Sequence, residues 1–172
     1  MKDLKEFLIQ FVGLKEGLHH FDYHISDKFF EFFQFDDFEN IEIDVKLDFQ
    51  KKSTMFILNF KSEGKVNVLC DVSGEPFDLD VVGDLKLIVK FGEEFNDDDE
   101  EILIIPHNEF QIDVAQYIFE MIVLSIPQKR IHPGVATGEV EVAELKNEKE
   151  ENKEEIDPRW EKLKQIQTNK KD

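Results

Sequence analysis

The sequence predicts an α+β fold: a twisted antiparallel β-sheet, built as a meander of hairpins and either open or barrel-like, packed against one buried helix. Two observations lead to this class. Alternating apolar and polar residues recur in several segments between positions 7 and 105, and this period is typical of strands with one buried face. The stretch FQIDVAQYIFEMIVLSIP, residues 110–127, is instead apolar on nearly every side of a helix. Such a helix is buried against more than one neighbour.

The N-terminal region predicts two strands and a short helix. In residues 7–11, Phe7, Ile9 and Phe11 would share one face of a strand, and residues 19–25 alternate after a glycine. Five phenylalanines then fall within residues 29–35, where Ser26 or Asp27 could begin a helix. We expect this aromatic helix to form a lid on the sheet. The alternative is an exposed patch that binds a partner. The lid is favoured because large exposed apolar patches are rare on monomers.

The middle of the chain predicts three strands in succession. Residues 41–49 alternate strictly, as expected for a half-buried antiparallel strand. Residues 54–60 are apolar on both faces, which favours a central position in the sheet. Residues 66–72 form the third run, beyond a predicted turn at Glu63 and Gly64.

A longer alternation follows a predicted turn at residues 73–76 and covers residues 77–91. Gly83 stays in phase with it but has no side chain, so we expect a bend or a close backbone approach there. Residues 95–101, FNDDDEE, predict an acidic loop, and residues 102–105 predict one more strand.

The buried helix has recognisable ends. Asp113 can act as N-cap, and Gln116 completes a capping-box pattern. Pro127 disfavours the α conformation at Ile126, so the helix should end there. At about 13 to 14 residues it is too short to span a membrane. Glu120 is its single charged group, and it either reaches solvent at the helix edge or meets a buried basic partner.

The chain divides into three predicted parts: a core domain (1–133), a flexible charged linker (134–156) and a C-terminal amphipathic helix or tail (157–172). The linker is rich in Glu and Lys and has little to bury. The terminal helix carries the only Trp of the chain. It either docks on its own domain or recognises a partner groove. Its candidate partner-binding residues are Asp157, Pro158, Arg159, Trp160 and Leu163.

The charge of the chain argues against nucleic acid as the main partner. The formal net charge is −18, and the residues before Pro133 hold 28 acidic and 13 basic side chains, a net charge of −15. Such a surface repels phosphates, which nucleic-acid-binding proteins neutralise with clustered Lys and Arg. A basic protein is a better partner for it. The chain shows no secretory signal and no apolar run of transmembrane length, so we expect a cytoplasmic protein without membrane contact.

Chemical motifs are sparse, and we expect neither catalysis nor a cofactor or metal. His20 and His24 would lie about 13 Å apart along a strand, too far to share one ion without other ligands. Cys70 is the only cysteine and falls on the apolar face of its strand, where a free thiol behaves as a small hydrophobe. The acidic segment 97–101 lacks the glycine and ligand spacing of an EF-hand. No phosphate-binding glycine loop or nucleophile elbow is present in the sequence.

Three stretches together resemble the YceD family, named for large ribosomal RNA subunit accumulation. VLCDVSGEPF, residues 68–77, stands where that family often has a Cys-Asp-Arg-Cys-type turn. Residues 113–127 are similar to its acidic-helix-Pro segment, and 157–163 to its terminal Asp-Pro-Arg signature. The positions that match outside the terminal signature are Cys70, Asp71, Asp113, Glu120, Leu124 and Pro127.

This chain departs from the family pattern in its cysteines. Many members carry a second cysteine in the turn and more before the terminal signature, and these look like zinc ligands. Here Cys70 stands alone, Ser73 takes the partner position, and His132 leads into a cysteine-free segment. The zinc role is therefore not transferred to this cysteine-poor member.

The resemblance implies a cytoplasmic (or plastid) bacterial-type factor needed for large-subunit ribosomal RNA, such as 23S rRNA, to accumulate, with no known chemistry. Combined with the charge, it favours a non-catalytic factor that binds a basic ribosomal protein or a large-subunit assembly intermediate. One alternative is an RNA-processing enzyme that binds magnesium through Asp97, Asp98, Asp99, Glu100 and Glu101. Another is a small-ligand binding protein with a cavity beneath the phenylalanine-rich helix at 29–35.

Overall fold

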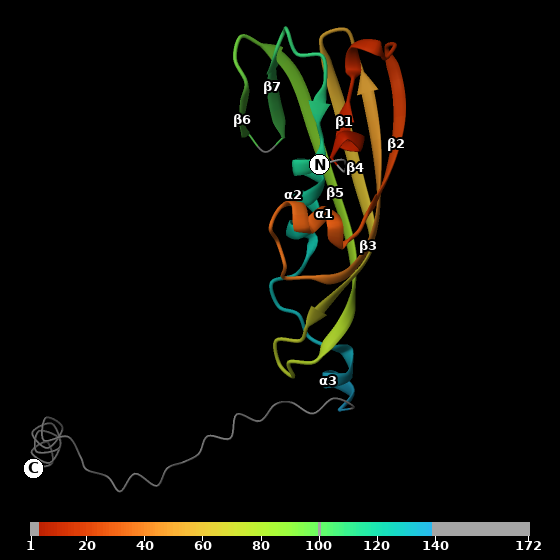
Figure 1. The fold of residues 1–172 in the computed structure, drawn as a ribbon, viewed down its shortest axis with the longest axis vertical. Coiled ribbons are helices and arrows are strands. Elements are labelled where there is room, and N and C mark those ends of the chain that lie inside the picture. Colours follow the sequence, from red (N-terminus) through yellow and green to blue (C-terminus); the bar gives the residue numbers. More distant parts are fainter. Residues whose placement is uncertain (1–3, 100, 139–172) are drawn as a thin grey trace, which may run out of the picture. The chain divides into compact units, whose positions relative to one another are not determined.

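The fold is organised around one six-stranded sheet (Figure 1). The computed structural model describes residues 4–99 and 101–138, so the predicted C-terminal helix at 157–172 and most of the predicted linker lie outside the described residues. The strands follow the spatial order β2-β3-β4-β5-β7-β6. Their bounds are β2 Gly17–Ile25, β3 Glu39–Lys51, β4 Met55–Leu69, β5 Pro76–Gly92, β6 Asn96–Asp99 and β7 Ile102–Pro106.

The predicted α+β class is confirmed, with a mixed sheet in place of a purely antiparallel one. Strands β2 to β5 form the expected antiparallel meander. Strand β7 then pairs parallel with the end of β5, from Ile88 opposite Ile102 to Gly92 opposite Pro106, and β6 pairs antiparallel on its far side. The sheet is open, so the barrel-like alternative is wrong for the part of the chain that the structure describes.

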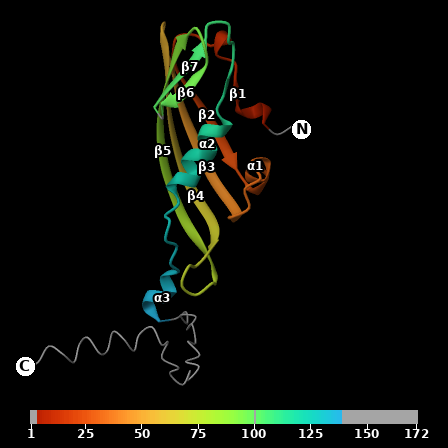
Figure 2. The same ribbon diagram turned by 90° about the vertical axis from the view of Figure 1, so that its left-hand side faces the viewer.

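One face of the sheet carries the helices and the core (Figure 2). Helix α2 (Ala115–Ser125) lies against β5, and helix α1 (Asp27–Phe32) lies against β3. The N-terminal segment forms two short 3₁₀ turns, η1 (Lys5–Phe7) and η2 (Phe11–Gly13), on either side of strand β1 (Leu8–Ile9). Strand β1 pairs with β8 (Ile112–Asp113) just before α2. The strand predicted over 7–11 is therefore only two residues long.

The phenylalanines of α1 form the predicted lid. Phe29 and Phe30 are buried, and Phe33 stacks on Phe119 of α2 with ring centroids 4.3 Å apart and planes 12° apart. Helix α2 is thus covered on two sides, by the sheet and by these rings, as its all-round apolar sequence predicts. Phe32 is the exception on α1, since 56% of it is exposed.

The ends of α2 differ in part from the prediction. The Asp113 carboxylate accepts a hydrogen bond from the Ala115 amide at 2.9 Å, but Val114 occupies the N-cap position. The Gln116 side chain donates to Glu120 at 2.8 Å, so the predicted capping box does not form. The helix ends at Ser125, and Ile126 is extended before Pro127, as expected.

Two glycines mark close approaches of neighbouring elements. A Cβ atom at Gly83 would lie 2.1 Å from Ser125 Oγ, because α2 crosses β5 there, and this confirms the predicted close approach. A Cβ atom at Gly64 would lie 2.2 Å from the Glu42 carbonyl oxygen. The turn predicted at Glu63 and Gly64 is wrong: β4 runs through both residues, and the missing side chain lets β3 pass close by.

Two segments predicted to be irregular have regular structure. Residues 96–99 of the predicted acidic loop form edge strand β6, since β7 offers them a partner. Residues 133–137 form the short helix α3 (Pro133–Thr137), and Gly138 ends it with a φ of 76°. The first residues of the predicted linker are therefore helical. Among the described helices, none is long and apolar enough to cross a membrane.

Candidate functional site

The turn between β4 and β5 holds the chain's single cysteine. The Cys70 amide donates to the Glu75 carbonyl at 2.8 Å, and the Gly74 amide donates to the Cys70 carbonyl at 2.9 Å. Gly74 has a φ of 73°, a conformation that glycine adopts without strain. These bonds close a tight turn and fix the direction of the Cys70 side chain.

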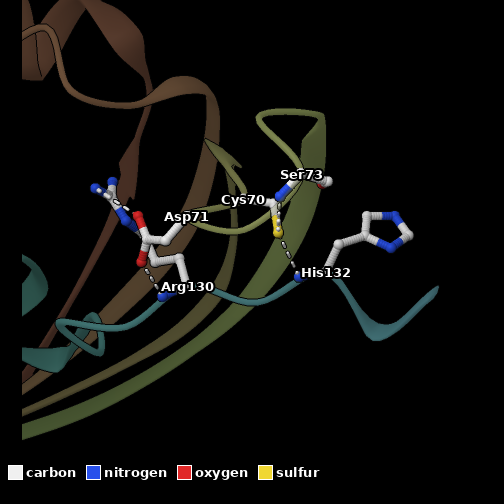
Figure 3. Close-up of polar contacts among 5 residues, drawn as sticks. All are labelled: Cys70, Asp71, Ser73, Arg130 and His132. Atoms are coloured by element: carbon white, nitrogen blue, oxygen red, sulfur yellow. Dashed lines mark hydrogen bonds and ion pairs between the residues drawn. The ribbon is translucent and has the colours of Figure 1, made fainter. Parts of the chain in front are cut away.

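The Cys70 sulfur receives two backbone hydrogen bonds. The amide of Ser73 lies 3.4 Å from Sγ, and the amide of His132 lies 3.2 Å from it (Figure 3). Burial raises the pKa of the thiol, but hydrogen bonds from His132, from the side chain and backbone of Ser73 and from the backbone of Val72 favour the thiolate and together outweigh burial, so the pKa falls to about 7. The hydrogen bonds around the sulfur therefore favour its thiolate form.

Asp71 attaches the same turn to the segment that follows α2. One of its carboxylate oxygens accepts from the Arg130 amide at 2.6 Å, and its own amide donates to the Arg130 carbonyl at 2.8 Å. The Arg130 guanidinium lies 3.9 Å from the other carboxylate oxygen. Cys70 and Asp71 together form a clip that holds residues 130–132 against the β4–β5 turn.

The His132 imidazole does not act on the Cys70 sulfur. Figure 3 shows the ring directed away from Sγ, and its Nδ1 atom accepts the Gly134 amide at 2.8 Å, which caps α3. The ring also lies edge-on to Phe77. Cys70 and His132 therefore do not form the thiol–imidazole pair that nucleophilic catalysis requires.

The residues around Cys70 do not supply a zinc site either. A structural zinc ion takes four ligands, usually Cys sulfur and His nitrogen. Ser73 stands where a second cysteine would be, and the His132 ring points away. Across the described residues, no three His, Cys, Asp or Glu side chains are grouped so that they could hold a metal ion.

A second feature is a groove of about 530 Å³ bounded by α2, β5 and the β6–β7 hairpin. Its apolar lining comes from both the sheet and the helix, and it includes Leu124, which is 83% exposed. Its described lining contains five carboxylates and no Lys, Arg or His. The carboxylates are Asp84, Asp97, Asp98, Asp99 and Glu120. We call this feature the acidic groove.

Tyr117 reports the electrostatics of the acidic groove. Burial, together with the nearby charges of Asp97, Glu120 and Asp113, raises the pKa of its hydroxyl to about 12. Negative charges that hold a phenol neutral also attract cations. The groove therefore combines apolar contact surface with a negative potential.

The carboxylates of β6 make bonds to their own segment. The Asp98 side chain accepts from the Asn96 side-chain amide at 2.9 Å, and Asp99 accepts from the Glu101 amide at 3.0 Å. All four residues of β6 are exposed. These contacts describe a solvated acidic strand, which fits a charged binding surface better than a convergent magnesium site.

The two histidines that share a face of β2 bind separate partners. His20 pairs with Asp48 of β3 at 2.6 Å, and His24 pairs with Asp44 at 2.9 Å. Both pairs lie on the exposed face of the sheet, opposite to the helices. They are cross-strand pairs on the surface of the sheet, and each imidazole is paired with a different aspartate.

The space beneath α1 is filled by aromatic side chains. Phe29 contacts Phe7 at a centroid distance of 4.9 Å, and Phe30 contacts Phe119 at 5.5 Å. A surface hollow lined by Leu4, His24 and Phe32 lies beside this helix. The cavity that a small-ligand binding protein would need beneath the helix is therefore occupied by the protein's own core.

Comparison with known families identifies the chain. The model of the family described as "Large ribosomal RNA subunit accumulation protein YceD" matches residues 58–167. This range covers well over half of the chain and includes all three stretches that carry the resemblance. The chain belongs to the YceD family. No curated protein and no solved structure matches it.

The structure places the positions that carry the resemblance in two groups. Cys70 and Asp71 form the clip described above, and Asp113, Glu120, Leu124 and Pro127 belong to α2 and its ends. Glu120 and Leu124 both line the acidic groove, so Glu120 is at the solvent-exposed edge. The candidate partner-binding residues lie in the matched range but outside the described residues: Asp157, Pro158, Arg159, Trp160 and Leu163.

Sequence reasoning missed the partners of the clip and the acidic groove. Arg130 and His132 contact the turn across 59 and 62 residues, and no local pattern predicts such a distance. The groove gathers residues from three separate segments. The sequence did contain the two ingredients of the groove, the apolar residue Leu124 of α2 and the acidic segment before β7, but nothing in it indicated that they lie together.

Proposed function

We propose that this YceD family protein is a non-catalytic cytoplasmic factor in biogenesis of the large ribosomal subunit. In this role it supports accumulation of large-subunit ribosomal RNA by binding a basic ribosomal protein or a large-subunit assembly intermediate. Membership of the family carries the proposal, since the family is named for that role. Its description names an accumulation protein and no enzymatic activity.

The charge of the described domain favours protein over RNA as the direct partner. Its acidic groove offers five carboxylates without a basic side chain among the described lining. RNA binding would place phosphates against these groups, and like charges in contact are unfavourable. Basic proteins in an assembling subunit present the opposite charge, which speeds encounter and suppresses wrong partners.

The C-terminal segment is proposed as a second contact. Residues 159–171 carry Arg159 and four lysines against one glutamate, and they include Trp160. Trp and Arg are enriched among residues that dominate binding energy at interfaces. In this proposal the acidic domain binds the basic partner and the Arg159–Trp160 arm completes the contact.

The test is sedimentation of tagged full-length protein from growing cells through a sucrose gradient. We expect it to travel with large-subunit precursors, and we expect the double variant Arg159→Ala/Trp160→Ala to shift toward the top. The matched control is Gln167→Ala/Thr168→Ala in the same tail. Absence of ribosomal material from the wild-type peak would overturn the proposed role. A gel shift of large-subunit RNA by the purified protein alone, at about 150 mM salt, would overturn the protein-mediated route.

A further inference from the structure

We propose that the acidic groove binds an extended Lys- and Arg-rich segment of the partner protein, which adds to β5 as a further strand. This inference rests on the proposed function for the existence of a basic partner, and it assigns where and how that partner binds. Such binding requires an unpaired strand edge with apolar side chains and carboxylates beside it.

The unpaired edge is a consequence of the strand lengths. Strand β7 pairs only with Ile88–Gly92 of β5, so no described strand covers the segment Val82–Leu87 on that side. Figure 1 shows β6 and β7 beside only one end of the long β5 strand. Six residues of a strand extend about 20 Å, enough for a short peptide to pair with.

The backbone groups of this segment point in a known direction. The Ile88 amide donates toward β7, to the Glu101 carbonyl at 2.7 Å, whereas the Gly83 carbonyl faces β4, where Ser62 Oγ donates to it at 3.3 Å. Because backbone groups alternate along a strand, the amides and carbonyls of Val82, Asp84 and Lys86 face the open side. A strand added there meets donors and acceptors in the register that a sheet requires.

The residues around this strand edge determine which side chains an added strand should carry. Asp84 lies on β5, Asp97–Asp99 lie on β6 and Glu120 lies on α2, so three of the elements that form the groove carry carboxylates. Leu85 and Leu124 supply apolar surface between them. Since side chains alternate along a strand, Lys or Arg on one side of the added strand would meet Asp84, while residues on the side facing α2 would meet Leu85 and Leu124 beside Glu120.

A synthetic probe separates strand addition from general charge attraction. The probe is a fluorescent ten-residue peptide of alternating lysine and valine, and binding is followed by anisotropy with the full chain. Two further peptides carry N-methyl groups on alternate backbone nitrogens, one in each of the two registers. We expect one of them to bind about tenfold more weakly than the other, because only one set of amides faces β5. Methylated peptides that bind equally, at either strength, would overturn strand addition.

Charge-matched variants test the location. Asp97→Lys/Glu120→Lys changes two exposed groove residues, and Asp22→Lys/Glu42→Lys makes the same change in net charge on β2 and β3, away from the groove. The groove variant should bind the unmethylated peptide about tenfold more weakly than the control variant. Equal binding by the two variants would overturn the groove as the site. Circular dichroism and thermal unfolding of both variants establish that they are folded.

The same variants in the gradient experiment separate this inference from the proposed function. If the wild type and the control variant travel with large-subunit precursors and the groove variant does not, both proposals are supported. If all three travel with precursors, the function stands and the groove assignment falls. If the wild type does not travel with precursors, the function falls, and the peptide measurements decide the groove by themselves.

Discussion

The sulfur of Cys70 accepts a hydrogen bond from the backbone amide of His132 at 3.2 Å, joining residues 62 positions apart in the chain. A second amide, from Ser73, approaches the same sulfur at 3.4 Å. The sulfur thus connects the β4–β5 turn to the segment that begins α3, and its protonation is coupled to that contact.

The first prediction concerns the ionisation of this thiol. In the folded protein the absorbance of the thiolate near 240 nm should rise with a midpoint near pH 7, with Cys70→Ser as the blank. In urea the midpoint should return to about 8.5. Since the folded pKa lies below the unfolded one, the stabilisation by the thiolate is present above the unfolded pKa and is lost as pH falls toward 7. A folded-state midpoint at 8.5 or above would show that the two amides do not stabilise the thiolate.

The second prediction concerns the Asp71 clip. Asp71→Ala leaves the Arg130 amide without its 2.6 Å acceptor, and we expect a loss of about 1–2 kcal/mol in the free energy of unfolding. Hydrogen exchange should quicken at residues 130–135 more than in the sheet, because the clip holds that segment. Asp80→Ala is the control: its partner Lys65 lies 3.6 Å away on an exposed surface, so the loss should be below about 0.5 kcal/mol. Equal losses in the two variants would contradict the assignment.

The third prediction concerns the contact of α2 with β5. Gly83→Ala would place a methyl group 2.1 Å from Ser125 Oγ and 2.8 Å from Ser62 Oγ, and such overpacking costs about 1–3 kcal/mol. Removing the closer oxygen in Gly83→Ala/Ser125→Ala should restore part of the loss. Gly13→Ala is the control, since no atom lies within 4 Å of its added Cβ. Urea unfolding measures all three, and a neutral Gly83→Ala would show that α2 does not lie this close.

The fourth prediction concerns Tyr23, whose buried hydroxyl has no hydrogen-bond partner among the described residues. Tyr23→Phe should leave stability at pH 7 unchanged or raise it by about 1 kcal/mol, because no bond is lost. Burial first, and then Glu6 and Asp113, raise the pKa of Tyr23 far above 10. Stability of the wild type is therefore retained below pH 10 and lost as pH rises above it, since only the unfolded chain ionises.

Urea titrations between pH 8 and pH 11 check this directly, and Tyr23→Phe should show the smaller alkaline loss. Tyr117→Phe is the matched comparison: its half-buried hydroxyl has a pKa of about 12, so its removal should also reduce the alkaline loss. A clear destabilisation of Tyr23→Phe at pH 7 would mean that the hydroxyl has a partner.

The sequence was a good guide to which face of each strand is buried. Strict alternation in β3 and β5 predicts the core face residue by residue, because the side-chain period of a strand is fixed. Alternation says nothing about the neighbouring strand, so the parallel pairing of β7 with β5 could not be foreseen. The turn predicted at Gly64 is wrong because the atom that requires a glycine there, the Glu42 carbonyl oxygen, belongs to another strand.

Only the part of the candidate site that comes from one short stretch of sequence was predictable. Cys70 and Asp71 stand out in the sequence as positions of the family resemblance, but the alternation places them in a strand, whereas β4 ends at Leu69 and both lie in the turn that follows. Their contacts, Arg130 and His132, depend on where the chain travels after α2, and that path is set by the packing of α2 on Gly83. The acidic groove likewise depends on β7 beginning opposite Ile88 of β5, a feature of strand pairing that no residue pattern encodes.

The β1–β8 pair joins Leu8 to Asp113 and Ile9 to Ile112, whereas β2, β3 and β4 each pair with the next strand in the chain. Closing a short hairpin costs less entropy than closing a loop of about a hundred residues. During synthesis the meander can therefore assemble first, while the N-terminal segment waits for the region around residue 113 to emerge. Folding should finish when Leu8 and Ile9 pair with residues 112–113, and a chain stalled before that region would leave this two-residue strand without its partner.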